Sequence, residues 1–266
     1  MKAVSKSDSL LITAAGVHTK VEEDLGVVFR WALPTGEAAK RTIKLYMDNI
    51  KDFRGVYTIT PDYLFGHSLL FDMKRAMAIN RIEHMGNSFH PPGCRNFEPF
   101  FKDALSTGAD TIFLLNYGAD TESAINYAYQ NRINERYKIL AVWSNGLQLI
   151  NHLGFDKFKN VYFGTQYWHE TNLPANNDFM ENWKTHFGTN PSYVEAYGYI
   201  SLYLYLLAMK ETRCTKKVGE LKEALEHLAW EGLTAPREYI QPLTHQTRKE
   251  YYLLTLDPEK HIIRPL

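Results

Sequence analysis

The clearest structural signal in the chain is the unbroken apolar run Thr111-Ile112-Phe113-Leu114-Leu115. A short run without alternation is typical of a strand that is buried on both faces of a sheet. Before this run, residues 96–106 carry aromatic and apolar side chains at helical spacing, and after it Asp120 is placed to cap a second helix. The run is therefore expected to be a strand between two helices, as in a βαβ unit.

The same alternation extends over residues 54–163. Further strands are expected at 54–59, 138–142 and 161–163, and a further helix at 68–80, after which Gly86 breaks the pattern. Strands and helices that alternate at this spacing predict an α/β fold with a parallel sheet.

The chain changes character after Pro174. Apolar stripes predict helices at 179–187, 191–209 and 218–228. These helices need a sheet to cover, yet the strand candidates that remain lie only at the ends, at 10–14 and 251–256.

The first strand candidate has an alternative interpretation. The short apolar run at 10–15 follows a basic end and superficially resembles a signal peptide, but charged residues follow it closely and favour a buried strand. The most apolar helical pattern, 193–209, contains Glu195 and falls short of the ~20 apolar residues of a membrane span.

Charge and composition argue against binding to nucleic acid or to an anionic membrane, and favour binding of a small molecule. Lys plus Arg and Asp plus Glu both number 30 in 266 residues, so the formal net charge is zero. This balance gives no electrostatic footprint for nucleic acid or for an anionic membrane surface. Aromatic residues make up 14% of the chain, and a surplus of Tyr and Trp suits a small-molecule cleft.

No pattern of catalytic or metal-binding residues emerges, and no cofactor is expected, because phosphate-loop and dinucleotide motifs are absent. The sequence around Ser144 resembles the nucleophile elbow of serine hydrolases, but Val142 replaces the glycine that this motif requires two residues before the serine. The ten histidines lack metal-ligand spacing and are interpreted as surface or capping residues. Cys94 and Cys214 are interpreted as two isolated thiols, with a disulfide as the alternative.

Ligands of a parallel sheet bind at the carboxyl ends of its strands. The loops expected there carry aromatic and neutral hydrogen-bonding groups, which suit binding rather than chemistry. They are Thr60-Pro61-Asp62-Tyr63, Asn116-Tyr117-Gly118-Ala119 and Trp143-Ser144-Asn145-Gly146.

A series of motifs resembles the branched-chain amino-acid-binding family, the type I periplasmic solute receptors of ABC transporters. The resemblance runs from about Leu10 to the end and rests on the order and spacing of the motifs together. The motifs include Asp62-Tyr63-Leu64-Phe65-Gly66, Thr107-Gly108-Ala109-Asp110, Tyr117-Gly118-Ala119-Asp120, Ala196-Tyr197-Gly198-Tyr199 and His245-Gln246.

This resemblance implies a two-lobed α/β fold with parallel sheets flanked by helices, in which the chain passes between the lobes three times. The second lobe would comprise residues 33–170 plus 251–266, and the first lobe residues 1–32 plus 171–250. The family's first lobe normally begins with a longer stretch that supplies most of its sheet. We therefore expect an incomplete first lobe, which could pair with a second copy in a homodimer.

The resemblance also implies ligand-binding residues. Phe65 and Tyr117 match family binding positions, and Ala15 and Gly16 lie in the loop that holds the polar end of the ligand, where Val17 replaces the family's hydroxyl. The acid that pairs with an amino-acid ammonium falls near Trp143 or Ser144, and neither is acidic. Asp62 could substitute from the neighbouring loop. Both departures argue against an α-amino-acid ligand.

The function implied is a receptor, not an enzyme, that captures a small organic solute (amino-acid-like, carboxylate or amide) between two lobes for uptake by an ABC transporter. Its expected partners are that ligand and the transporter's permease, which is its only link to a membrane, and no nucleic acid is expected. The family works in the periplasm or outside the cell, although this chain shows no convincing signal peptide. A regulatory small-molecule sensor on the same fold is the alternative.

Overall fold

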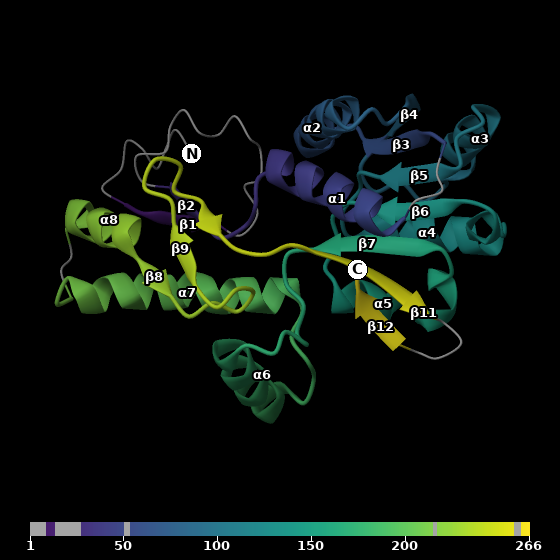
Figure 1. Cartoon of the computed structure of the whole chain (residues 1–266). Coiled ribbons are helices and arrows are strands. Elements are labelled where there is room, and N and C mark those ends of the chain that lie inside the picture. The colour runs from purple at the N-terminus through teal and green to yellow at the C-terminus, as the bar shows by residue number, and fades with distance from the viewer. Residues whose placement is uncertain (1–8, 14–27, 51–53, 215–216, 258–261) are drawn as a thin grey trace. The chain divides into compact units, whose positions relative to one another are not determined.

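The computed structural model describes residues 9–13, 28–50, 54–214, 217–257 and 262–266 (Figure 1). The chain forms two compact units, which are described separately. Unit 1 comprises Met1–Pro34 and Gln166–Glu250, and unit 2 comprises Thr35–Thr165 and Tyr251–Leu266. In the lobes expected from the sequence, the chain passes from one lobe to the other after residues 32, 170 and 250. That the units act as the two lobes of a receptor stays a prediction.

Unit 2 is built on a seven-stranded sheet of order β12-β11-β7-β6-β5-β3-β4. The strands β3 to β7 run parallel, β11 pairs antiparallel with β7, and β12 pairs antiparallel with β11. Their bounds are β3 Val56–Pro61, β4 His84–His90, β5 Thr111–Leu114, β6 Lys138–Ala141, β7 Val161–Thr165, β11 Tyr252–Asp257 and β12 Ile262–Pro265. The apolar run at 111–115 is a central strand with both faces buried, as predicted.

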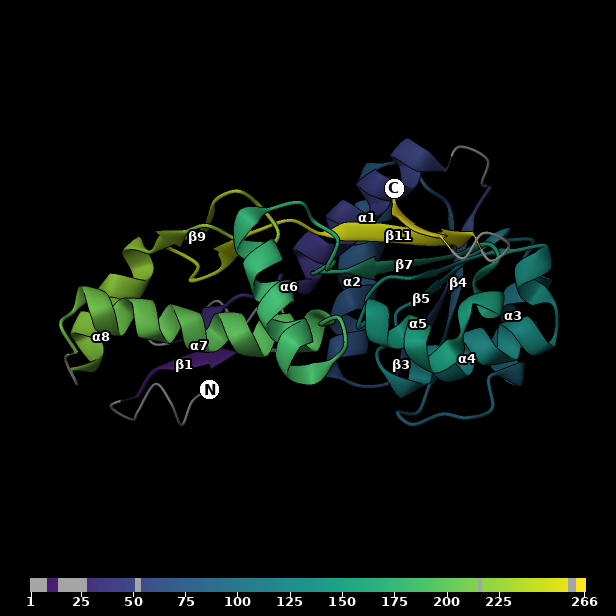
Figure 2. The ribbon, with the colours of Figure 1, turned by 90° about the horizontal axis from the view of Figure 1, so that it is seen from below.

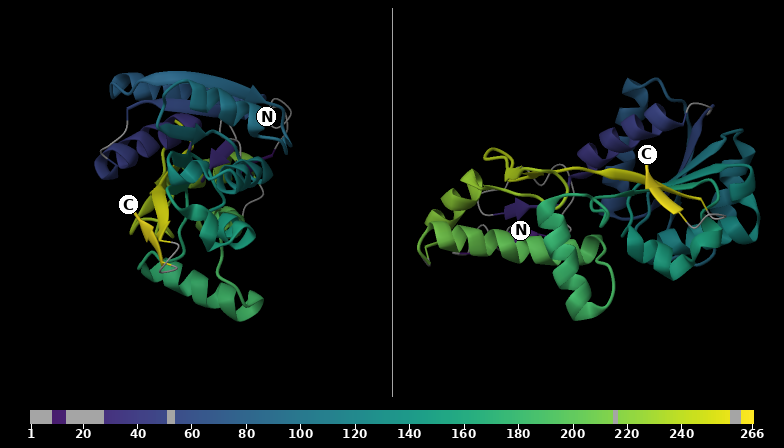
Figure 3. Two further views of the ribbon diagram at one scale, coloured as in Figure 1. Left: turned by 90° about the vertical axis from the view of Figure 1, so that its right-hand side faces the viewer. Right: turned by 60° about the horizontal axis from the view of Figure 1, so that its bottom comes forward.

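Helices cover both faces of this sheet (Figures 2 and 3). They are α1 Thr35–Asn49, α2 Leu64–Ile79, α3 Glu98–Ser106, α4 Ala119–Gln130 and α5 Leu147–Leu153, with 3-10 turns η2 Ile133–Glu135 and η3 Phe155–Phe158. The helices α1 and α2 pack on one face through a core that includes Ile43, Met73 and Phe113. The other three lie on the opposite face because right-handed crossovers change face when the chain reverses its direction along the sheet. The chain moves from β3 outward to β4, and then back through β5 and β6 to β7.

Strand β4 shows that the expected break at Gly86 was wrong. The strand continues through Gly86 at a φ of +154°, and the Tyr57 ring lies 2.7 Å from the place that a Cβ would occupy. The polar sequence of β4 hid the strand, because this strand ends the sheet and needs no apolar run. Asn87 Oδ1 accepts from the hydroxyls of Thr58 and Thr60 at 2.8 and 2.6 Å.

Unit 1 contains three helices and two small sheets within its described residues (Figure 1). The helices are α6 Pro174–Phe187, α7 Tyr193–Glu211 and α8 Val218–His227. The strands β1 Leu11–Thr13 and β2 Val28–Arg30 pair in parallel, and β8 Ala229–Trp230, β9 Glu238–Ile240 and β10 Thr247–Arg248 form an antiparallel sheet. This three-stranded sheet corrects the expectation that further strands lie only at the chain ends.

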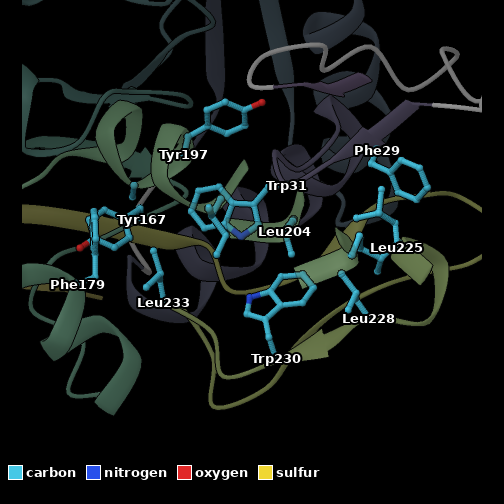
Figure 4. Packing of buried hydrophobic residues seen from close by; sticks show 14 of the residues in the cluster. Phe29, Trp31, Tyr167, Phe179, Tyr197, Leu204, Leu225, Leu228, Trp230 and Leu233 are labelled. Atoms are coloured by element: carbon cyan, nitrogen blue, oxygen red, sulfur yellow. The ribbon is translucent and has the colours of Figure 1, made fainter. Parts of the chain in front are cut away.

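The core of unit 1 is rich in aromatic rings (Figure 4). Trp31 lies at its centre, where its indole N–H donates to a carboxylate oxygen of Glu238 at 2.7 Å. Glu238 also accepts from the backbone N–H and the hydroxyl of Thr234, at 2.9 and 2.7 Å. A buried carboxylate is thus satisfied by three donors, as burial of a charge requires.

An apolar groove of about 850 Å³ lies between β1, α7 and α8 of unit 1. None of its lining residues is charged; they are Ser9, Leu10, Ile12, Gly198, Ser201, Leu202, Tyr205, Met209, Val218 and Leu221. Among the described strands, β1 pairs only with β2. This face therefore has a strand edge that no second described strand covers, together with uncovered apolar side chains.

Cys94 and Cys214 are both free, which confirms the interpretation of two isolated thiols. In the part of the chain that the structure describes, no helix combines the length and the apolarity needed to cross a membrane.

Candidate ligand-binding site

The carboxyl ends of β3 and β5 form the topological switch point of unit 2. The chain leaves β3 toward β4 through α2, and leaves β5 in the opposite direction, toward β6, through α4. Open α/β sheets bind their ligands at an edge of this kind. Three of the strand ends named from the sequence, those of β3, β5 and β6, are neighbours at this edge.

Aromatic side chains gather where β3 leads into α2. Phe65, in the first turn of α2, lies edge-on to Trp143, with ring centroids 5.8 Å apart. The Tyr63 ring also packs against Phe65, with ring centroids 5.9 Å apart. Burial raises the pKa of Tyr63, with a smaller contribution from Asp120, so its hydroxyl stays protonated at neutral pH. These rings offer an apolar wall with one phenol.

Tyr117 lies in the turn between β5 and α4 and is half-buried. The turn ends at Gly118, where a φ of +59° favours glycine, and α4 begins at the next residue. Asp120 is not the helix cap that the sequence suggested. Gly118 takes that position, and the Asp120 carboxylate instead accepts from the backbone N–H of Gly93 at 3.2 Å.

Trp143 and Ser144 follow β6, and both are buried. The Ser144 hydroxyl donates to the carbonyl oxygen of Gly164 at 2.9 Å and accepts from the N–H of Gly146 at 3.1 Å. Its one O–H is therefore engaged within the turn. In this conformation Ser144 shapes the loop, and Trp143 presents the ring that contacts Phe65.

Asp62 follows β3 and is exposed. Its carboxylate lies 2.7 Å from Nε2 of His67 in the first turns of α2, and its backbone N–H donates to the carbonyl oxygen of His90 at 2.7 Å. The local pairing with His67 gives the carboxylate a partner in its own loop.

Two residues of this edge were not among the predicted site residues. His90 ends β4 and Asn116 follows β5; both are fully buried, and His90 Nε2 lies 3.0 Å from Asn116 Oδ1, within hydrogen-bond distance. His90 was interpreted as a surface or capping histidine, and the structure contradicts this. The strand that carries it was hidden by its polar sequence, so the sequence offered no signal that would have placed the two together.

The structure thus brings Asp62, Phe65, Tyr117, Trp143 and Ser144 to one edge of the unit 2 sheet. Ala15 and Gly16, which were expected to hold the polar end of a ligand, lie outside the described residues. Over the described ranges, no group of three or more His, Cys, Asp or Glu residues could hold a metal ion. Aromatic and hydroxyl side chains are of the kind that stack on and hydrogen-bond to small ligands, and that these residues do so stays a prediction.

Comparisons with known proteins identify the fold and the family. The structure matches an amino acid ABC transporter substrate-binding protein of Pseudomonas fluorescens Pf-5 with a TM-score of 0.92 and 32% identity, over 100% of this chain and 72% of that chain. It also matches a solute-binding protein of R. palustris in complex with 4-hydroxybenzoate, with a TM-score of 0.86 and 15% identity, over 100% and 73% of the chains.

A third match is a branched chain amino acid ABC transporter ligand-binding protein of Burkholderia xenovorans LB400, with a TM-score of 0.82 and 15% identity, over 100% and 72% of the chains. The last two likenesses show the fold alone. A comparison with curated proteins gave no match. Residues 1–261 match the family model described as periplasmic binding protein. The chain therefore belongs to the periplasmic binding protein family, whose members are solute-binding proteins with an α/β fold of this kind.

Proposed function

We propose that this receptor captures a small organic carboxylate or neutral solute with an apolar or aromatic body and presents it to the permease of an ABC transporter. The observation that carries the choice of ligand is the turn after β6. Trp143 and Ser144 stand there, where the resemblance places the acid that pairs with an amino-acid ammonium.

An ammonium group buried in a receptor needs a carboxylate beside it, because an unpaired buried charge costs several kcal/mol. The acids that stand just after β3 and in the first turn of α4, Asp62 and Asp120, already have partners. Asp62 pairs with His67, and Asp120 accepts from Gly93. A tryptophan face holds a cation with only about 0.5–2 kcal/mol. A ligand without an α-ammonium avoids this cost.

The aromatic wall supports an apolar or aromatic ligand body. Phe65, Trp143 and Tyr63 form a continuous group of rings, and Tyr117 lies at the end of the neighbouring strand. Edge-to-face and offset contacts between such rings and a ligand add about 0.5–1.5 kcal/mol beyond the area that they bury. The R. palustris protein of the same fold holds 4-hydroxybenzoate, a ligand of this class.

The test compares matched ligands that differ only in the amino group. Leucine and 4-methylpentanoate, and phenylalanine and 3-phenylpropanoate, are titrated into the protein while tryptophan fluorescence and heat are followed. We expect the des-amino acids to bind more tightly within each pair. Tighter binding of the free amino acids would refute the proposal, and Asp62→Asn would then show whether Asp62 holds the ammonium.

The family consists of solute-binding proteins rather than enzymes, and it is periplasmic. We propose accordingly that this chain releases its ligand unchanged, on the outer side of the permease. Mass spectrometry of the ligand after prolonged incubation checks this, because any product would reveal turnover.

A homodimer remains the proposal for the uncovered face of unit 1. The edge of β1 that no second described strand covers and the uncharged lining of the groove suit a second copy, since pairing of the β1 edges would cover both. Light scattering over a range of concentrations tests it. Leu202→Lys, in the groove lining, should give a monomer if the dimer forms there.

A further inference from the structure

A hydrogen bond ties the carboxyl ends of β4 and β5 together across the end of β3, which lies between them in the sheet. Nε2 of His90, the last residue of β4, lies 3.0 Å from Oδ1 of Asn116. An amide oxygen can only accept, so this bond uses a proton on Nε2. The amide nitrogen of Asn116 donates in turn to the carbonyl oxygen of Asp120 at 3.4 Å. This second bond fixes which way the amide group faces, so its oxygen stays directed at His90.

A second hydrogen bond joins the loop after β4 to Asp120, at the far end of the turn 116–120. The backbone N–H of Gly93 donates to the carboxylate of Asp120 at 3.2 Å. The loop after β4 therefore holds both Asn116 and Asp120, and Tyr117 lies between these two fixed points. Gly118, with a φ of +59°, ends the turn, and α4 begins at the next residue.

The imidazole is itself held in place. The rings of Phe97 and Phe100 lie 5.0 and 5.7 Å from the His90 ring. Because His90 is fully buried, its donor at Nε2 has a fixed direction, and loss of this bond would leave the Asn116 oxygen buried without its partner.

We propose that His90 is a positioning residue for ligand binding, which holds the turn 116–120 in the conformation that presents Tyr117 to the ligand. This inference rests on the proposed function, because it takes Tyr117 as a ligand contact. His90 acts through Asn116 rather than by contact with the ligand. A turn that is ordered before binding spares the complex the cost of ordering it, and so raises affinity.

The experiment separates this role from a general contribution to folding. His90→Leu and Asn116→Ala each remove one side of the hydrogen bond, and His90→Gln keeps an N–H donor. The matched control is His84→Leu, since His84 begins the same strand and bonds to the Thr58 hydroxyl at 2.9 Å instead of to the turn. Two quantities are measured on the whole chain. They are the amide exchange rates of residues 116–120, and the affinities for 4-hydroxybenzoate and 3-phenylpropanoate with Tyr117 or with Tyr117→Ala.

We expect His90→Leu and Asn116→Ala to speed exchange in the turn and to weaken binding by about tenfold, the usual effect of losing one buried hydrogen bond. The two changes together should do no more than either alone, and His90→Gln should recover part of the loss. With Tyr117→Ala in place, removing the His90 side chain should change affinity less than twofold. His84→Leu should leave both quantities unchanged.

Unchanged exchange in the turn, or an equal loss of affinity with and without Tyr117, would overturn the assignment of His90. If neither probe binds the parent protein, the proposed ligand class has failed, and the exchange rates alone decide whether His90 orders the turn. If His90→Leu does not fold, Asn116→Ala supplies the same comparison.

Discussion

The ammonium of Lys249 lies 3.0 Å from the centroid of the Trp31 ring in unit 1. Both side chains are buried, so the attraction between the cation and the ring acts with little water present and is worth about 2 kcal/mol. We expect Lys249→Met, which keeps the side-chain length and removes the charge, to lower the free energy of unfolding of unit 1 by about this amount.

The effect of Lys249→Met is measured by urea unfolding, with hydrogen exchange in β9 and α7 as the readout for unit 1. The control is Lys210→Met on the exposed face of α7, which should change stability by less than about 0.5 kcal/mol. If Lys249→Met is as stable as the parent, the free-energy cost of burying the ammonium equals the stabilisation that it gains from the Trp31 ring.

Tyr251 fastens the final segment of the chain into unit 2. Its hydroxyl lies 2.7 Å from the hydroxyl of Thr42 on α1 and donates to the carbonyl oxygen of Val142. Tyr251→Phe leaves both partners buried and unsatisfied, and should cost about 1–3 kcal/mol of stability. Thermal unfolding measures this. Tyr129→Phe on the exposed side of α4 is the matched control, and equal melting temperatures for the two variants would contradict the prediction.

His169 should make unit 1 sensitive to acid. Burial lowers its pKa below the usual 6.5, against a smaller opposing effect of Glu170. The unfolded chain therefore binds this proton more tightly than the folded unit does. The stability that the neutral imidazole contributes is complete above about pH 6.5 and is lost as the pH falls through that value toward the lower folded pKa.

The acid sensitivity is measured as the free energy of unfolding between pH 7.5 and pH 5. We expect His169→Gln to flatten the slope by up to about 1.4 kcal/mol per pH unit. His186→Gln, on the exposed end of α6, should leave the slope as it is. The same slope in both variants would assign the acid sensitivity to another group.

Tyr117 should contribute more to affinity than to folding. Tyr117→Ala is expected to weaken binding of the tightest des-amino acid by roughly 1–3 kcal/mol, because a ring contact and a polar partner are lost together. Calorimetry gives the affinity and thermal unfolding the stability. Unchanged affinity with a large loss of stability would place Tyr117 in the core of unit 2 instead.

The groove predicts unequal protection of the two units. Among the described strands β1 has a single neighbour, and α7 carries exposed apolar side chains. Amides of β1 and α7 should therefore exchange faster than those of β5 and β6, which are central in their sheet. Hydrogen exchange measures this directly. Equal, high protection of both units in a protein shown to be monomeric by light scattering would count against it.

Much of the unit 2 fold could be predicted because its central strands are buried on both faces. Burial on both sides leaves a continuous apolar run, as at 111–115, and such runs together with the helical stripes define the βαβ order. Strand β4 escaped because it ends the sheet, where Asn87 and Ser88 can satisfy polar neighbours. Edge strands carry no apolar run for a sequence pattern to detect.

The candidate site was predictable in part for a similar reason. Phe65, Tyr117 and Trp143 follow strands whose carboxyl ends are neighbours, so the topology alone gathers them. The engagement of Ser144 by Gly164 and the pairing of His90 with Asn116 join residues 20 and 26 positions apart. Such pairings depend on strand order and register, which local periodicity does not specify.

Because β11 pairs with β7, one edge of β7 stays uncovered during synthesis until β11 has been made. The ribosome releases β7 roughly 85 residues before β11, and at about 5–20 residues per second this leaves the edge of β7 without its neighbour for about 4–17 s. During that time an exposed strand edge is open to pairing with other nascent chains. Translation speed over residues 166–251 and the supply of chaperones should therefore set how much of this receptor reaches its native form.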